Sequence, residues 1–210
     1  MANKEPKVFY GLSNVHYAKL TETTDPETGV VTSSYGQVKK WPGAVNIALS
    51  PSGNPVIFSA DNSAYYTISN NRGYEGDFES AKIPDDIHVD VNGEHVDDKG
   101  FIVETDKDEV SYFALMFEFE TDVNPNRYVF YKVCLASRPE VGSETVDVNG
   151  DITPRTNSVS FKAMPQTDVK VIDGKQCHLV KAFTGANVDL AAYNSFYQSV
   201  YTPTFNGGES

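Results

Sequence analysis

Alternation of apolar and polar positions is strongest between Tyr112 and Arg138, where it predicts one long β-hairpin. In its first strand every second residue is large and apolar and the residues between are mixed: Phe113, Leu115, Phe117 and Phe119 against Tyr112, Ala114, Met116 and Glu118. After a turn at residues 122–126, the second strand is expected to alternate in the same way, with Val129, Tyr131, Val133 and Leu135 on one face and Tyr128, Phe130, Lys132, Cys134 and Ala136 on the other. The mixed face needs a partner, a ligand or a lumen.

Shorter runs with the same alternation predict further strands on both sides of this hairpin. They are Lys7–Leu20, Ala44–Leu49, Val56–Ala60, Tyr65–Ile68, Tyr74–Ile83, Val159–Met164 and Leu179–Phe183. The turn SPSGNP is expected to join Ala44–Leu49 to Val56–Ala60 as a second hairpin.

Helical patterns are few and short. A helix is expected to start at Pro84, because proline is tolerated in the first turn and the acids Asp85 and Asp86 suit its positive end. The acidic, turn-rich residues 93–110 predict a loop or a short hairpin. Leu190–Val200 has helical spacing and predicts a short turn of helix.

These elements predict a mainly β chain, folded as one β-sandwich or barrel-like domain over residues 1–210 with one short flanking helix. Residues 1–20 are expected to form an N-terminal arm and the first strand. Residues 21–43 are expected to form a polar hairpin that projects from the body, with its turn at Asp25–Gly29. Residues 204–210 are expected to be a frayed tail.

Composition limits the classes of partner. The formal charge is -12, from 17 basic and 29 acidic side chains, which argues against a surface that grips nucleic acid by its phosphates. The two cysteines, Cys134 and Cys177, lack metal-site spacing and are expected to be buried, reduced thiols, which suits assembly in cytoplasm. We expect neither a secretory signal nor membrane insertion, because no apolar run approaches the ~20 residues that span a bilayer.

Residue patterns for catalysis, metals and cofactors are weak. Residues 147–151, DVNGD, resemble a calcium loop, but glycine falls at the fourth position and not at the sixth. His88 and His95 lie near four aspartates without the spacing of a metal motif, and no nucleophile elbow or phosphate-binding loop is present. We therefore expect no enzyme, no metal and no cofactor. Trp41 with Tyr65 and Tyr66 leaves open an alternative, a carbohydrate-binding β-sandwich.

Several long blocks of the chain carry a family resemblance. In order, they are GLSNVHYA, WPGAVNIALSPSGNPVIFSADNSAYYT, NNRGYEGDFESAKIPDD, FALMFEFETD and RYVFYKVCLASRP, and the likeness extends from Gly11 to Met164. Through them the chain resembles the major tail proteins of long-tailed, non-contractile bacteriophages of Gram-positive hosts. Agreement of several long blocks in one order is far more specific than any short motif.

The resemblance implies a virion structural protein of the phage tail, assembled in the host cytoplasm. Such a subunit forms hexameric rings with copies of itself, and the rings stack into a hollow tube through which DNA is ejected. The implied partners are other copies and other tail proteins, such as the tape measure, tail terminator and distal tail proteins. The DNA passes through the lumen without specific binding, because acidic walls repel phosphate within a screening length of ~8 Å.

Two sets of residues are candidates for assembly on this interpretation. The projecting hairpin and the N-terminal arm supply candidate contacts between subunits and rings: Tyr17, Asp25, Glu27, Val30 and Trp41. The mixed face of the long hairpin supplies candidates for the lumen or a neighbouring contact: Met116, Glu118 and Glu120. Strand register decides which face points inward, since a slip of one residue exchanges the two.

Overall fold

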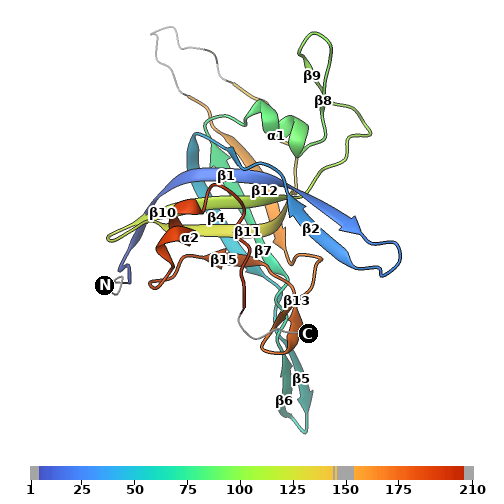
Figure 1. Ribbon diagram of the computed structural model, residues 1–210, viewed down its shortest axis with the longest axis vertical. Coiled ribbons are helices and arrows are strands. Elements are labelled where there is room, and N and C mark those ends of the chain that lie inside the picture. Colours follow the sequence, from blue (N-terminus) through green and yellow to red (C-terminus); the bar gives the residue numbers. More distant parts are fainter. Residues whose placement is uncertain (1–4, 144, 146–153, 206–210) are drawn as a thin grey trace.

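The structure, a computed structural model, describes residues 5–143, 145 and 154–205. Its main sheet contains β1 Phe9–Thr24, β2 Val31–Tyr35, β3 Lys39–Lys40, β4 Ala44–Ser52, β7 Gly73–Ser80, β10 Phe113–Thr121, β11 Asn126–Leu135, β12 Asn157–Met164 and β15 Lys181–Phe183. The strand order is β2-β1-β10-β11-β12-β7-β4, with β3 beside β1 and β15 beside β11, and the pairs are antiparallel (Figure 1). The prediction of a mainly β fold is confirmed.

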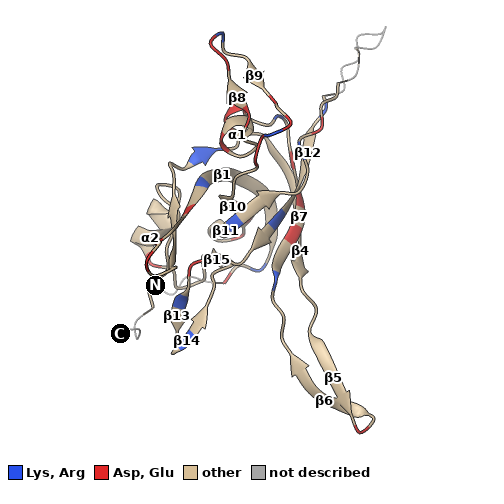
Figure 2. Cartoon of the chain, turned by 90° about the vertical axis from the view of Figure 1, so that its right-hand side faces the viewer, with Lys and Arg blue, Asp and Glu red and all other residues tan. Residues whose placement is uncertain are grey.

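The sheet curls, so that β1 and β4 lie close in space and the fold is barrel-like. Figure 2 shows β1, β10 and β11 on one side of the body and β12, β7 and β4 on the other. Residues 41–43 cross between the two sides: the Trp41 amide donates to the Val15 carbonyl at 2.8 Å, and the Ala81 amide donates to the Gly43 carbonyl at 2.7 Å.

An aromatic core fills the space inside the curled sheet. Its buried members are Val15, Tyr17, Trp41, Phe78, Ile83, Ile87, Val91, Phe113, Leu115, Phe117, Phe130, Val133, Leu135, Val159, Phe161 and Ala163. Trp41 packs edge to face on Phe78, with ring centroids 4.9 Å apart. The helix α1 (Asp85–Asp90) begins after Pro84, as predicted, and covers this core with Ile87.

The long central hairpin forms as β10 and β11, but its predicted alternation is wrong for part of β11. Val129 and Tyr131 belong to a second buried cluster on the opposite face of the strand, whereas Val133 and Leu135 lie in the aromatic core. The pairing register shifts between Phe113 and Leu115 of β10, which marks a β-bulge. An extra residue in one strand moves the side chains that follow it to the opposite face of the sheet. A single two-residue alternation therefore cannot describe the whole of β11.

The predicted hairpin around SPSGNP is also wrong. β4 continues through Pro51 and pairs with β7, while β5 (Val56–Ala60) pairs with β6 (Ser63–Ile68). The turn of this second hairpin is Asp61-Asn62, and both residues have positive φ, 50° and 58°, as a two-residue primed turn requires. We call β5, β6 and this turn the arm; it projects far from the body (Figure 1).

Glycines mark the base of the arm. Gly53 has φ +96°, and a Cβ there would lie 2.3 Å from the Asn70 carbonyl oxygen. Gly73 has φ +101°, and its Cβ would lie 1.9 Å from the Ala163 carbonyl oxygen. Only glycine permits this combination of backbone conformation and close approach. These two glycines therefore mark where the paired strands of the body end and the arm begins.

The N-terminal elements differ in extent from the prediction. β1 runs without interruption from Phe9 to Thr24, and its end pairs with β2 from Leu20↔Tyr35 to Thr24↔Val31. The projecting hairpin is thus shorter than residues 21–43, because residues 39–41 return to the body and pair with β1.

A second helix, α2 (Leu190–Ser195), forms within Leu190–Val200, where the helical spacing predicted a short turn of helix. Asp189 caps it, since its side chain accepts a hydrogen bond of 2.9 Å from the Ala192 amide. Phe196 and Val200 then pack on Ala114, Met116, Val129 and Tyr131, on the outer face of the central strands. We call residues 189–202 the C-terminal segment. Residues 206–210, most of the expected frayed tail, lie outside the described residues.

Two small hairpins complete the fold. They are β8 (His95–Val96) with β9 (Ile102–Val103), and β13 (Lys170–Ile172) with β14 (Lys175–Cys177). The first is the short hairpin that the acidic segment predicted. The second was not predicted. Cys134 and Cys177 are free and only half-buried, which corrects the expectation of buried thiols.

The packing predicts stability effects of very different size for two phenylalanines. Phe117→Ala removes a fully buried ring and should lower the free energy of unfolding by about 4 kcal/mol. Phe58→Ala, in the arm, should change it by less than about 0.5 kcal/mol, as for an exposed side chain. Urea denaturation of the monomer followed by fluorescence measures both, and equal losses would contradict the assignment of Phe117 to the core.

Candidate functional site

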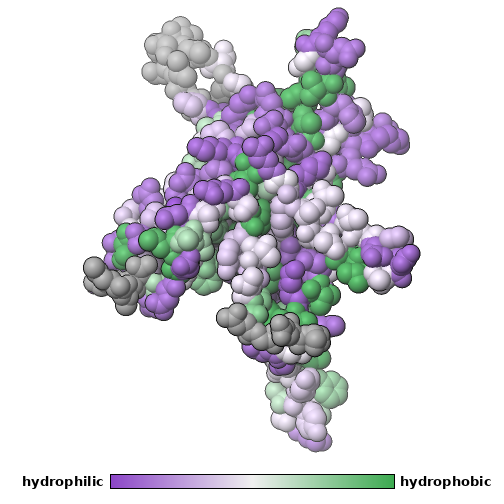
Figure 3. Space-filling view, in the orientation of Figure 1, coloured by the Kyte–Doolittle hydropathy of each residue, from purple (hydrophilic) through white to green (hydrophobic). Residues whose placement is uncertain are grey.

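The arm is the most exposed apolar element of the described chain. Its six large apolar side chains are between 50% and 70% exposed: Val56, Ile57, Phe58, Tyr65, Tyr66 and Ile68. Between residues 54 and 71 the only charged side chain is Asp61, at the tip (Figure 2). Figure 3 shows the arm standing clear of the body at the bottom of the view.

One face of the arm concentrates these side chains. Val56 pairs across the strands with Ile68, and Phe58 pairs with Tyr66, so all four lie on one face. A two-stranded hairpin alone is only marginally stable in water, and exposed apolar patches of this kind mark interaction sites. The arm therefore has the composition and the position of a contact element for another protein surface.

The tip of the β1–β2 hairpin holds three of the predicted contact residues. Asp25 shapes the turn: its carboxylate accepts hydrogen bonds from the amides of Glu27 at 2.8 Å and Thr28 at 3.0 Å. These backbone hydrogen bonds lower the pKa of Asp25. Glu27 is exposed and Val30 is 58% exposed, so both remain available at the surface of the hairpin.

The other two predicted contact residues lie in the core. Tyr17 and Trp41 are each 1% exposed. The Tyr17 hydroxyl donates to Asp90 at 2.9 Å, and the Trp41 indole N–H donates to the Ser80 hydroxyl at 3.3 Å. Neither offers surface to another subunit in this conformation. Tyr17 was expected in an N-terminal arm but lies in the middle of β1, and Trp41 was expected in the projecting hairpin but lies where the chain returns to the body.

The predicted lumen face is covered by the chain itself. Met116 is fully buried and Glu118 is 4% exposed, both beneath the C-terminal segment, while Glu120 is exposed. The hypothesis that Met116 and Glu118 line a lumen or meet a neighbour is therefore corrected. The mixed face is covered by apolar residues of the same chain, some 80 positions further along the sequence. The alternation within a strand does not indicate which distant segment will pack on it.

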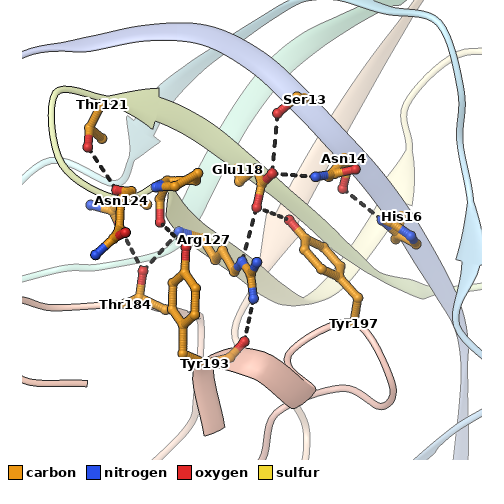
Figure 4. Close-up of polar contacts among 12 residues, drawn as sticks. Ser13, Asn14, His16, Glu118, Thr121, Asn124, Arg127, Thr184, Tyr193 and Tyr197 are labelled. Atoms are coloured by element: carbon orange, nitrogen blue, oxygen red, sulfur yellow. Dashed lines mark hydrogen bonds and ion pairs between the residues drawn. The ribbon is translucent and has the colours of Figure 1, made fainter. Parts of the chain in front are cut away.

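Glu118 is the centre of a buried polar cluster (Figure 4). Arg127 Nε donates to Glu118 Oε2 at 3.0 Å, and these two side chains are 16% and 5% exposed. The Tyr197 hydroxyl donates to Oε2 at 3.3 Å, and Ser13 and Asn14 donate to Oε1. β1, β10, β11 and the C-terminal segment thus meet at one carboxylate.

Arg127 ties the C-terminal segment to the sheet. Its guanidinium lies over the Tyr193 ring, 3.9 Å from the centroid, and donates to the Tyr193 carbonyl. The Tyr193 hydroxyl donates to the Pro125 carbonyl at 3.0 Å. Burial raises the pKa of both Tyr193 and Tyr197, so these hydroxyls stay protonated and act as hydrogen-bond donors. The cluster fixes the segment in place and contains no nucleophile–base pair.

His16 borders the cluster. Its ring stacks on Tyr197, with centroids 4.4 Å apart, and its Nδ1 lies 2.7 Å from the Asn14 carbonyl, to which it must donate. Burial lowers the pKa of His16 from 6.5, and Lys40 lowers it further, against the raising effects of the Asn14 carbonyl and Glu118. The folded chain therefore favours the neutral ring.

The structure does not bring together the residues of the candidate sugar-binding and metal-binding sites. Trp41 is buried while Tyr65 and Tyr66 lie on the arm, so the three form no sugar-stacking platform. Among the described residues no group of His, Cys, Asp and Glu could hold a metal ion. His88 Nδ1 instead lies 2.9 Å from Glu94. The calcium-like residues 147–151 lie outside the described residues.

No helix in the described part of the chain has the length and apolar character needed to cross a membrane. No protein-family model matches the chain, and no curated protein matches it.

The Glu118 cluster yields a stability prediction with a matched control. Glu118→Ala leaves Arg127 buried without its carboxylate and should lower the free energy of unfolding by about 3 kcal/mol. Glu120→Ala, two residues away on the same strand but exposed, should change it by less than about 0.5 kcal/mol. Urea unfolding measures both. Equal effects would show that the cluster does not hold the C-terminal segment.

His16 yields a prediction about acid stability. Its folded pKa lies below its unfolded value of 6.5, so the unfolded chain binds more protons as the pH falls through this range. The stabilisation is complete above the unfolded pKa and is lost as the pH falls through the folded one. His16→Gln should therefore flatten the loss of stability between neutral pH and about pH 5. Parallel pH profiles for variant and parent would refute this role.

Proposed function

We propose that this chain is a structural subunit of a bacteriophage virion that assembles with copies of itself into stacked, hexameric rings. The stacked rings form the tail tube of a long-tailed, non-contractile phage, through which DNA is ejected. The observation that carries the proposal is the arm, a hairpin with an apolar face, no core of its own and a single charged side chain, Asp61, at its tip. Its apolar side chains leave water only when another molecule covers them.

The sheet edges support assembly between identical copies. β2 and β4 are the end strands of the main sheet in the part of the chain that is described. Exposed edges invite pairing with further strands, and in a closed ring each copy can satisfy the edge of the next. β4 leads directly into the arm, so one subunit presents an open edge and an apolar hairpin on the same side.

The charge suits a channel for DNA. On β7, the side chains of Glu75 and Asp77 are exposed, and β7 pairs with β4 at the edge of the sheet (Figure 2). Lys162 lies 3.3 Å from Glu75 and is the near counter-charge on β12. We assign this outer face of β7, in place of Met116 and Glu118, to the wall of the tube. An acidic wall would repel phosphate and let the duplex slide.

The sequence resemblance supplies the rest of the proposal. The expected partners are further copies of the chain and the tape measure, tail terminator and distal tail proteins. The expected location is the virion tail, after assembly in the host cytoplasm.

The arm gives the decisive test. The double variant F58S/Y66S removes one cross-strand apolar pair and should abolish tubes while leaving the melting temperature of the monomer unchanged, because the pair contacts no core. Negative-stain microscopy of the concentrated parent protein, with tail-initiating partners if required, should show tubes roughly 100 Å wide.

Val171→Ser is the matched control, since Val171 is exposed on a different hairpin. It should still form tubes. Tubes of normal form from F58S/Y66S would remove the arm from the assembly. A parent chain that stays monomeric under all of these conditions would overturn the proposed function itself.

A further inference from the structure

An apolar groove of about 410 Å³ lies where the start of β1 meets the start of β4. The two strands are close there, but in the described part of the chain β4 pairs only with β7, so the curled sheet is open along this line. The more buried lining residues also pack against the aromatic core: Leu12, Ile47, Phe119 and Tyr128. The more exposed ones are Phe9, Tyr10 and Val45, at 52% to 55%. We call this the β1–β4 groove.

The groove and the arm have matching chemistry. Both present aromatic and branched apolar side chains to water. None of the described residues that line the groove is charged, and Asp61 at the tip is the one charged residue of the arm. Bringing the two surfaces together would therefore remove apolar area from water without stripping a charged group of its hydration.

The apolar face of the arm is large enough for a protein contact. Val56, Phe58, Tyr66 and Ile68 are each at least half exposed. Taking roughly 150–250 Å² for a whole aromatic side chain, these four present on the order of 400 Å². Each partner in a standard interface contributes about 800 Å², so the arm can supply about half of one side. The open edge of β4, which leads into the arm, adjoins this face and can extend the contact.

The arm does not fill the groove of its own subunit. Val45 and Ile47 lie near the start of β4, whereas the arm follows the end of the same strand. Because an extended chain rises ~3.3 Å per residue, Phe58 lies up to ~35 Å beyond Ile47 along the strand direction. Figures 1 and 2 show that the arm continues away from the body. An arm that fills the groove therefore belongs to a second copy of the chain.

We propose that the β1–β4 groove of one copy receives the apolar face of the arm of the next copy. Phe58 and Tyr66 pack there against Phe9, Tyr10 and Val45. The inference rests on the proposed function and names the surface that the arm meets. Because arm and groove are different patches of one chain, the contact is heterologous. Each copy uses its arm on one neighbour and its groove on another, which extends the assembly into a ring or an open stack.

Crosslinking between two single-cysteine variants tests the contact. In a full-length background that carries Cys134→Ala and Cys177→Ala, Phe58→Cys marks the arm and Val45→Cys marks the groove. Mixed at high concentration and treated with a short bis-maleimide, the two variants should give a crosslinked dimer. Neither variant alone should give one, and Val171→Cys mixed with Phe58→Cys should give none, because Val171 is exposed on a different hairpin.

The single-variant samples separate the other possible occupants. A dimer from Phe58→Cys alone would mean that two arms pair with each other, and a dimer from Val45→Cys alone would mean that two grooves do. Either result would overturn the proposal, as would a mixture that gives no dimer. Both positions are exposed, so the melting temperature of each variant should match that of its background.

Two neighbouring charges test which face of the arm is used. Tyr66→Glu, added to the Phe58→Cys variant, should lower the yield of mixed dimer about tenfold or more, because an unpaired charge would lose its hydration in the contact. Thr67→Glu is the matched control, since Thr67 pairs with Ile57 on the opposite face. It should leave the yield unchanged, and equal losses from the two variants would overturn the assignment of the face.

Tube formation by the parent chain is scored separately by microscopy. Mixed dimers without tubes would uphold the contact and overturn the tube. Tubes without mixed dimers would uphold the tube and overturn the contact.

Discussion

The rest of the structure depends on the burial of the β10–β11 hairpin on both faces. Its inner face forms the aromatic core with Phe113, Leu115 and Phe117, and its outer face is covered by the C-terminal segment. Hydrophobic burial of this kind is the dominant favourable term in folding. Because both faces are satisfied within one chain, the centre of the sheet is not available to partners, and the surfaces that remain are its edges and hairpins.

The polar cluster at Glu118 accounts for the charged residues on the outer face of the β10–β11 hairpin, which is otherwise apolar and buried. A buried ion pair often contributes little net stability compared with an apolar pair, because both ions lose their hydration. Its geometry is nevertheless demanding: Arg127 must reach Glu118, Tyr193 and Tyr197 together. We interpret the cluster as the feature that sets where the C-terminal segment docks, while Phe196 and Val200 supply the apolar contact.

The arm differs from the central hairpin because nothing in the described part of the chain covers its apolar face. Val56, Phe58, Tyr66 and Ile68 lie on one face and are each at least half exposed. Exposed apolar patches of this kind are typical of surfaces that contact another protein.

The sequence alone determined the mainly β class, the central hairpin, the start of α1 and the turn at Asp25, because each depends on local periodicity or on one turn residue. It could not determine the pairing of β4 with β7, since several hairpin partners satisfy the same alternation and the Asp61-Asn62 turn competes with SPSGNP. Nor could it show that Tyr17, Trp41, Met116 and Glu118 are buried. A bulge, a returning strand and a helix far along the chain decided those positions, and such long-range packing leaves no period in the local sequence.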